Sequence, residues 1–114
     1  MAMVLVTDDV AVAAKLFRGF SDRTRLSILR RLAPGEQRVT DLVRQLGGSQ
    51  SNISEHLGCL KDCGLVTDRP VGRQVYYRIA APEVVDMLTA AERLLGVHGR
   101  QIELCPNYRE PADG

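Results

Sequence analysis

Two short amphipathic segments joined by a pair of glycines constrain the fold of this chain more than any other feature. Residues 39–57, VTDLVRQLGGSQSNISEHL, carry apolar side chains at helical spacing on both sides of Gly47 and Gly48. Thr40 and Ser49 are residue types that cap helix N-termini, so a helix is predicted to begin at each of them. Because paired glycines allow a sharp turn, the segment predicts a helix-turn-helix whose second helix can enter a DNA major groove.

The segment that follows predicts a wing. Residues 65–80, LVTDRPVGRQVYYRIA, alternate apolar and polar side chains around Gly72, which is typical of a two-stranded β-hairpin. Helical spacing of apolar residues predicts three further helices, at 8 to about 20, 21–33 and 83–97. The predicted fold class is therefore mainly α with a β-hairpin wing, a winged helix-turn-helix.

The length of the chain predicts one domain. Its 114 residues suffice for a single hydrophobic core, so residues 1–114 are expected to form one domain with a polar C-terminal tail from about 99 to 114. No apolar run approaches the 18 or so residues of a membrane span. The opening residues lack the basic segment of a secretory signal and contain Asp8 and Asp9. We therefore expect a cytoplasmic protein without a membrane partner.

The segment 83–97 carries a wide apolar stripe, and the first predicted helix is apolar as well. Such a stripe either covers the core of its own chain or packs against a second copy. The combination of two apolar helices at the two ends of the chain favours a homodimer through the first and last helices. The stripe consists of Val84, Met87, Leu88, Ala91, Leu94 and Leu95.

Polar side chains on the second helix of the helix-turn-helix and on the wing are candidates for contact with double-stranded DNA. The short helix groups can reach base edges or phosphates, while the histidine there is also a metal candidate by its position. The basic wing residues have the reach and charge for a phosphate or the minor groove, with a solvated hairpin as the alternative. The candidates are Ser49, Gln50, Ser51, Asn52, Ser54, Glu55 and His56 on the helix, and Arg69, Arg73 and Gln74 on the wing.

The cysteines define a second candidate site. Three cysteines in a reducing compartment favour free thiols, a metal site or a redox switch over a disulfide framework. Cys59 and Cys63 are four residues apart on a predicted helix, so their thiolates share one face and can bind one soft cation. Tight binding normally needs a third donor, and Cys105 in the tail could reach back or across to a partner subunit. Buried, apolar cysteines are the alternative.

Several of these motifs together resemble the ArsR/SmtB family of metal-responsive winged-helix repressors. The pattern S-x-x-S-x-H-L-x-x-L at 51–60, the following G-L-V and the G-R-x-x-Y of the wing carry the resemblance, which extends over roughly residues 10–98. Cysteines at 59, 63 and 105 are similar to those of the cadmium- and lead-sensing CmtR type. The Asp-x-His pair of last-helix zinc sensors and the Cys-x-Cys of arsenic sensors are both missing from this sequence.

The resemblance implies a homodimeric repressor that binds operator DNA in the metal-free form and is released by Cd(II) or Pb(II), with Zn(II) as a further effector. It also implies a metal site in which Cys59 and Cys63 of one subunit are joined by Cys105 of the other. A thiol-based redox-sensing repressor is the alternative, since pairs of exposed cysteines can respond to oxidation. No cysteine–histidine arrangement of a nucleophilic enzyme is present, so the sequence predicts no enzymatic activity.

Overall fold

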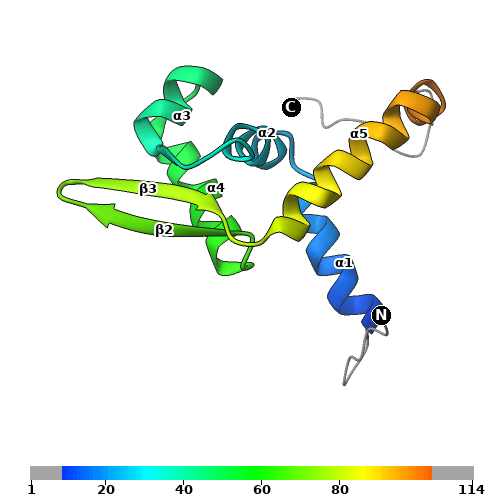
Figure 1. The fold of residues 1–114 in the computed structure, drawn as a ribbon, viewed down its shortest axis with the longest axis horizontal. Coiled ribbons are helices and arrows are strands. Elements are labelled where there is room, and N and C mark those ends of the chain that lie inside the picture. Colours follow the sequence, from blue (N-terminus) through cyan, green and yellow to red (C-terminus); the bar gives the residue numbers. More distant parts are fainter. Residues whose placement is uncertain (1–8, 104–114) are drawn as a thin grey trace.

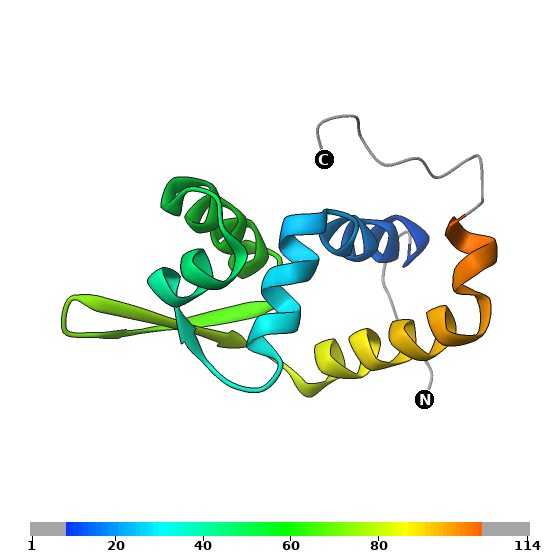
Figure 2. The ribbon, with the colours of Figure 1, turned by 90° about the horizontal axis from the view of Figure 1, so that it is seen from above.

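The computed structural model describes residues 9–103 and confirms a mainly helical winged fold (Figure 1). The wing, made by β2 and β3, projects at one end of the molecule, and α1 and α5 extend at the other (Figures 1 and 2). The elements in chain order are α1 Asp9–Phe20, α2 Arg23–Leu32, β1 Gln37–Arg38, α3 Val39–Leu46, α4 Gln50–Asp62, β2 Val66–Val71, β3 Gln74–Ile79 and α5 Pro82–Glu103.

The core lies between α2, α3, α4, the base of the wing and the first turns of α5. On α4 the predicted stripe is confirmed: Ile53, Leu57 and Leu60 recur at helical spacing and are at most 1% exposed. These three contacts fix the rotation of α4 about its axis and leave its opposite face to solvent. The buried core residues are Ile28, Leu29, Leu32, Leu42, Ile53, Leu57, Leu60, Leu65, Val66, Val84 and Leu88.

Both ends of α4 form as the sequence predicts. At the N-terminus, the Ser49 hydroxyl accepts a hydrogen bond from the Asn52 backbone N–H at 3.0 Å. At the C-terminus, Gly64 adopts a left-handed φ of 78°, and its N–H donates to the Lys61 carbonyl at 2.9 Å. The Leu65 N–H donates to the Leu60 carbonyl at 2.9 Å, which completes a Schellman motif and turns the chain into β2.

The predicted start of α3 at Thr40 is wrong, because the helix N-cap is Arg38. Arg38 also belongs to β1, a strand of two residues that pairs with β3 opposite Tyr76. The predicted hairpin of β2 and β3 is confirmed, and β1 adds a third strand to it, in the order β1-β3-β2. A two-residue strand is too short to produce an alternating pattern, and Arg38 ends that strand and begins the helix at once.

The last helix is longer than predicted. It begins at Pro82, as expected for a proline in the first helical position, but continues to Glu103 instead of ending near 97. The glycines at 96 and 99 weaken a helix without breaking it, and good helix formers follow them. The first residues of the predicted tail, 99–103, are therefore helical, and Cys105 lies outside the described residues. Within residues 9–103, none of the helices is long and apolar enough to span a membrane.

The first and last helices carry exposed apolar side chains. None of the residues of α1 is buried, and Val10 and Phe17 are 77% and 58% exposed. Among the α5 side chains that the structure describes, those of the first turns reach the core, whereas Leu94 and Leu95 are each about half exposed. Apolar surface of this extent is typical of a face that packs against another protein surface. The two alternatives for the stripe thus apply to different parts of α5: its first turns cover the core of the chain, and the exposed remainder is available for the predicted dimer.

Candidate nucleic-acid interface and thiol pair

The N-terminal turns of α4 present a row of exposed polar side chains. Gln50, Ser51, Asn52, Ser54 and Glu55 are all exposed, because the core contacts of α4 lie on its other face. Ser49 is exposed as well, but its hydroxyl oxygen already accepts the capping hydrogen bond. The structure thus brings six of the seven predicted helix residues together on one surface.

His56 points in a different direction. Its side chain is 20% exposed, and its Nδ1 lies 3.8 Å from the Asp22 carboxylate at the start of α2. The same carboxylate oxygen accepts a hydrogen bond from the Arg25 backbone N–H at 3.0 Å and so caps α2. His56 therefore takes part in the contact between α4 and α2 and does not belong to the exposed polar row.

The predicted wing residues differ in their surroundings. Arg73 and Gln74 are exposed at the hairpin tip, where Gly72 has the positive φ of 59° that suits the first central residue of a tight turn. Arg69 instead forms an ion pair with Glu36, and its guanidinium lies 5.3 Å from the centre of the Tyr76 ring. This contact ties the wing to the segment before β1.

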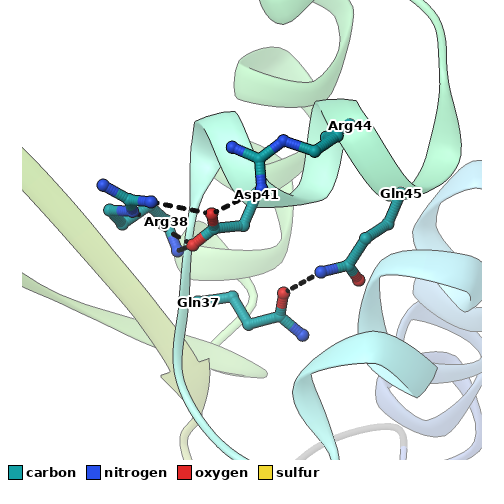
Figure 3. A network of polar contacts seen from close by, with 5 residues as sticks. All are labelled: Gln37, Arg38, Asp41, Arg44 and Gln45. Atoms are coloured by element: carbon teal, nitrogen blue, oxygen red, sulfur yellow. Dashed lines mark hydrogen bonds and ion pairs between the residues drawn. The ribbon is translucent and has the colours of Figure 1, made fainter.

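A polar network joins β1 to the N-terminus of α3 (Figure 3). The Asp41 carboxylate accepts hydrogen bonds from the Arg38 side chain at 2.9 and 3.1 Å and from the Arg38 backbone N–H at 3.2 Å. Arg44 approaches the same carboxylate at 3.6 Å. Asp41 occupies the third helical position, where a carboxylate typically reaches back to the N-cap N–H. That position is a sequence signal that would have located the start of α3 correctly.

A second pair of contacts extends this network to α2. The Gln45 side chain donates to the side-chain Oε1 of Gln37 at 2.6 Å, and the Gln37 Nε2 in turn donates to the Arg31 backbone carbonyl at 2.6 Å. Figure 3 shows the contact between Gln45 of α3 and Gln37 of β1, and the hydrogen bond of Gln37 to Arg31 connects both to the end of α2. Since β1 pairs with β3, the helix-turn-helix and the wing are held in a fixed relative placement.

The hydrogen bond from the Arg38 side chain lowers the pKa of Asp41 from 3.8 to about 2, with the Arg38 backbone N–H and the nearby guanidinium charges acting in the same direction. A carboxyl whose pKa is lower in the folded state stabilises the fold at pH values above its ordinary pKa. This contribution is complete above about pH 4 and is lost as the pH falls towards 2. The connection between the wing and α3 is therefore at full strength at neutral pH.

The two helix cysteines lie side by side at the opposite end of α4 from the polar row. Cys59 is in the last turn of the helix and Cys63 is its C-cap; the Cys63 N–H donates to the Cys59 carbonyl at 3.0 Å. Both are free thiols and both are exposed. Helical geometry thus places the two sulfurs on one face, as the spacing predicts, and the alternative of buried, apolar cysteines is wrong.

The thiols open into a groove of about 380 Å³ between α1 and α4. The lining residues are Lys15, Arg18, Gly19, Arg25, Cys59, Leu60 and Cys63. Within the described residues 9–103, no group of three or more His, Cys, Asp or Glu side chains lies close enough to hold a metal ion. The pair offers two soft donors in an accessible position, so a third donor has to come from outside this set. The basic side chains of α1 at this groove were not predicted, since only the fold brings them there.

Comparison with known proteins places these features in a family context. The family model described as "Bacterial regulatory protein, arsR family" matches residues 22–68, which span α2 to the start of the wing. A probable mercury resistance operon repressor of Streptomyces lividans is 35% identical over 101 residues, covering 89% of this chain and 79% of that protein. The transcriptional regulator CmtR of Mycobacterium tuberculosis is 45% identical over 67 residues, 59% of this chain and 57% of that protein.

A solved structure supports the fold assignment over nearly the whole chain. The homodimeric winged helix-turn-helix DNA-binding domain Mb0332 of Mycobacterium bovis, described as a possible ArsR-family transcriptional regulator, has a TM-score of 0.70 and 26% identity. The match covers 96% of this chain and 99% of that domain. The likeness thus includes the first and last helices, which the family model does not reach.

Proposed function

Because the chain belongs to the arsR family of bacterial regulatory proteins, we propose that it is a homodimeric repressor that releases operator DNA when a soft metal ion binds its thiols. The family and the relatives described above consist of DNA-binding transcriptional regulators, so the chain is a regulator of transcription and not an enzyme. A regulator of this kind acts where the operator DNA is, and this supports a cytoplasmic location as part of the proposal.

One observation carries the proposal: the thiol pair and the polar row lie at opposite ends of the same helix. Cys59 and Cys63 are at the C-terminus of α4, and Gln50 to Glu55 are exposed at its N-terminus. A metal ion held by the two thiolates therefore acts on the helix that reads DNA, without an intervening element. Ligand binding changes DNA affinity only if it favours a different placement of that helix.

The donor set favours a thiophilic ion. Thiolates select soft ions such as cadmium over magnesium or calcium. Cd(II) or Pb(II), with Zn(II) as a further effector, therefore fits a site made of two cysteines and a third thiolate ligand. The relative from Streptomyces lividans is named for resistance to mercury, another thiophilic metal. We propose Cys105 of the partner subunit as the third ligand. We also propose that residues 1–114 are a single domain, of which the segment with Cys105 is the C-terminal tail.

For the DNA side, we propose that α4 enters the major groove and that the tip of the wing contacts the backbone or the minor groove. The apolar faces of α1 and α5 pair two copies, which sets two α4 helices on successive major grooves about one helical turn apart. A palindromic operator follows from this symmetry. His56 supports these contacts from its place between α4 and α2, and Arg69 supports them through its ion pair at the wing. The proposed DNA contacts are Ser49, Gln50, Ser51, Asn52, Ser54, Glu55, Arg73 and Gln74.

The experiment that tests the proposal is a metal titration of the reduced protein on the DNA of its own promoter. Cadmium is expected to release the DNA at the same metal concentration at which the thiolate-to-metal absorption in the ultraviolet appears. Magnesium at equal concentration serves as the hard-ion control and is expected to leave the complex intact. DNA that stays bound while the absorption band saturates would contradict metal-driven release.

The different surroundings of the two wing arginines lead to a prediction. Among residues 9–103 no ion pair engages Arg73, whereas Arg69 is paired with Glu36. Arg73→Ala is therefore expected to weaken binding to all duplexes similarly and to reduce the slope of log affinity against log salt by about 1. Arg69→Ala is expected to leave that slope unchanged, and Arg73→Lys should retain it. Fluorescence anisotropy at several salt concentrations measures each slope, and an undiminished affinity of Arg73→Ala would remove the wing tip from the DNA contacts.

A redox response is the second candidate function, because both helix thiols are exposed and lie on one helical face. In that case oxidation of Cys59 and Cys63, not metal coordination, lowers the DNA affinity. The two functions separate under strict reduction with a metal chelator. A redox sensor then holds DNA until peroxide is added, whereas a metal sensor releases it on addition of excess cadmium without any oxidant.

A further inference from the structure

We infer that Lys15 and Arg18 of α1 make the thiol site selective for divalent soft cations over trivalent arsenic. This inference rests on the proposed metal-binding function and concerns its ligand class. It begins from the described residues that line the groove, of which three are basic and none is acidic. Basic side chains around a binding site distinguish ligands by the net charge of the complex that each ligand forms.

The charges of the complexes differ by one unit. Three thiolates and a divalent cation such as Cd(II) or Pb(II) form a complex with a net charge of −1, whereas three thiolates and As(III) form a neutral one. Both complexes use the same three sulfurs, and both ions are soft. Neighbouring ammonium and guanidinium groups therefore stabilise the divalent complex by Coulomb attraction and leave the arsenic complex nearly unaffected.

The three basic residues have different roles in the groove. The Arg25 side chain donates to the Gly19 carbonyl at 3.1 Å and to the Arg18 carbonyl at 3.3 Å, so it fastens the end of α1 to α2. Lys15 and Arg18 are exposed and contribute their charge at the rim. Replacing Arg25 would disturb the packing of α1, while Lys15 and Arg18 can be neutralised without removing these hydrogen bonds.

The position of the two rim residues on α1 keeps them away from its apolar face. At about 100° per residue, Lys15 and Arg18 are roughly 60° apart on the helix; the exposed apolar residues Leu16 and Phe17 lie on the opposite side, and Val12 lies on the flank, about 60° from Lys15. Neutralising the rim is therefore expected to leave the apolar face of α1, and with it the proposed dimer, unchanged. Light scattering on the variants measures this directly.

The test compares two ions on the same reduced protein. In the double variant Lys15→Gln/Arg18→Gln, the Cd(II) affinity is expected to fall roughly three- to tenfold, as for the loss of two exposed charge interactions, while the As(III) affinity stays within about twofold. The charge-preserving variant Lys15→Arg/Arg18→Lys should keep the wild-type ratio of the two affinities. Arg31→Gln removes an exposed positive charge outside the groove and should also keep it. Competition with a chromophoric chelator gives both affinities.

Ionic strength supplies an independent readout. Sodium perchlorate, whose anion does not coordinate cadmium, is expected to weaken Cd(II) binding by the wild-type protein and to affect the double variant less. An affinity ratio that is the same in the wild type and the double variant would overturn the inference, as would an equal loss for both ions, which indicates a structural effect. A wild-type protein that binds neither ion would overturn the proposed function as well, so the two failures are distinguishable.

Discussion

Replacing Cys59 or Cys63 with serine is expected to lower the affinity for cadmium by more than about 100-fold. Mutation of a residue that hydrogen-bonds a metal ligand already lowers the metal affinity roughly 10- to 100-fold, and here a ligand itself is lost. Serine keeps the size of the side chain but is a poor donor for soft ions. Both cysteines are exposed, so the free energy of unfolding should change by less than about 0.5 kcal/mol. DNA binding by the metal-free variants should be retained.

Isothermal titration under reducing conditions and the thiolate-to-metal absorption band measure this loss. Gly58→Ala is a matched control on the same helix, because a β-carbon there meets no atom within 4 Å. That variant should keep its cadmium affinity within about twofold and gain helix stability, since alanine is favoured over glycine by roughly 1 kcal/mol. If either serine variant binds cadmium as tightly as the wild type, with the same absorption band, the helix pair is not the metal site.

Loss of Cys105 is expected to separate metal binding from DNA release. Allosteric couplings typically amount to about 1–3 kcal/mol, which is a change of roughly 5- to 150-fold in DNA affinity. Two thiolates on one helix bind a metal but link nothing to the partner subunit. Cys105→Ser should therefore bind DNA normally and retain weaker cadmium binding, while the release falls to less than about threefold. DNA binding with and without saturating cadmium gives the coupling directly.

Mixed dimers test whether the third ligand crosses the interface. One subunit lacks Cys105 and the other lacks both Cys59 and Cys63. If coordination crosses between subunits, such a dimer keeps one complete site and binds one cadmium ion tightly. If all three ligands come from one chain, no complete site remains, and the absence of tight binding would refute the intersubunit arrangement. The parent homodimers, each without a complete site, provide the baseline.

Local patterns predicted most of the fold, because the apolar spacing and the capping residues of each helix lie within its own segment. The apolar stripe at 53, 57 and 60 and the caps Ser49 and Gly64 fixed α4 from the sequence, and the structure confirms all of them. One error is the end of α5, which continues past Gly96 and Gly99. The others lie where two elements meet: the strand β1 exists only through its pairing with β3, and Arg38 is the N-cap of α3 because that pairing brings the chain to this position.

The residues of the candidate site also fall into two classes, those that local spacing predicts and those that only the packing of distant segments brings together. The thiol pair was predictable, because spacing along one helix determines that the two side chains share a face. The ion pair of Arg69 with Glu36, 33 residues earlier in the chain, and the contact of His56 with Asp22 arise only when distant segments pack together. The basic rim of the thiol groove belongs to this second class, since Lys15 and Arg18 are more than 40 residues from Cys59 in the chain.

The geometry of α4 makes it a lever. A helix of 13 residues is about 20 Å long at 1.5 Å per residue, with the thiols at one end and the exposed polar row at the other. A tilt of about 5° around the thiol end therefore displaces the opposite end by roughly 1.7 Å. Hydrogen bonds lose most of their strength over a smaller displacement than that. A metal ion that tilts α4 by about 5° around its thiol end can thus break DNA contacts while every helix stays folded.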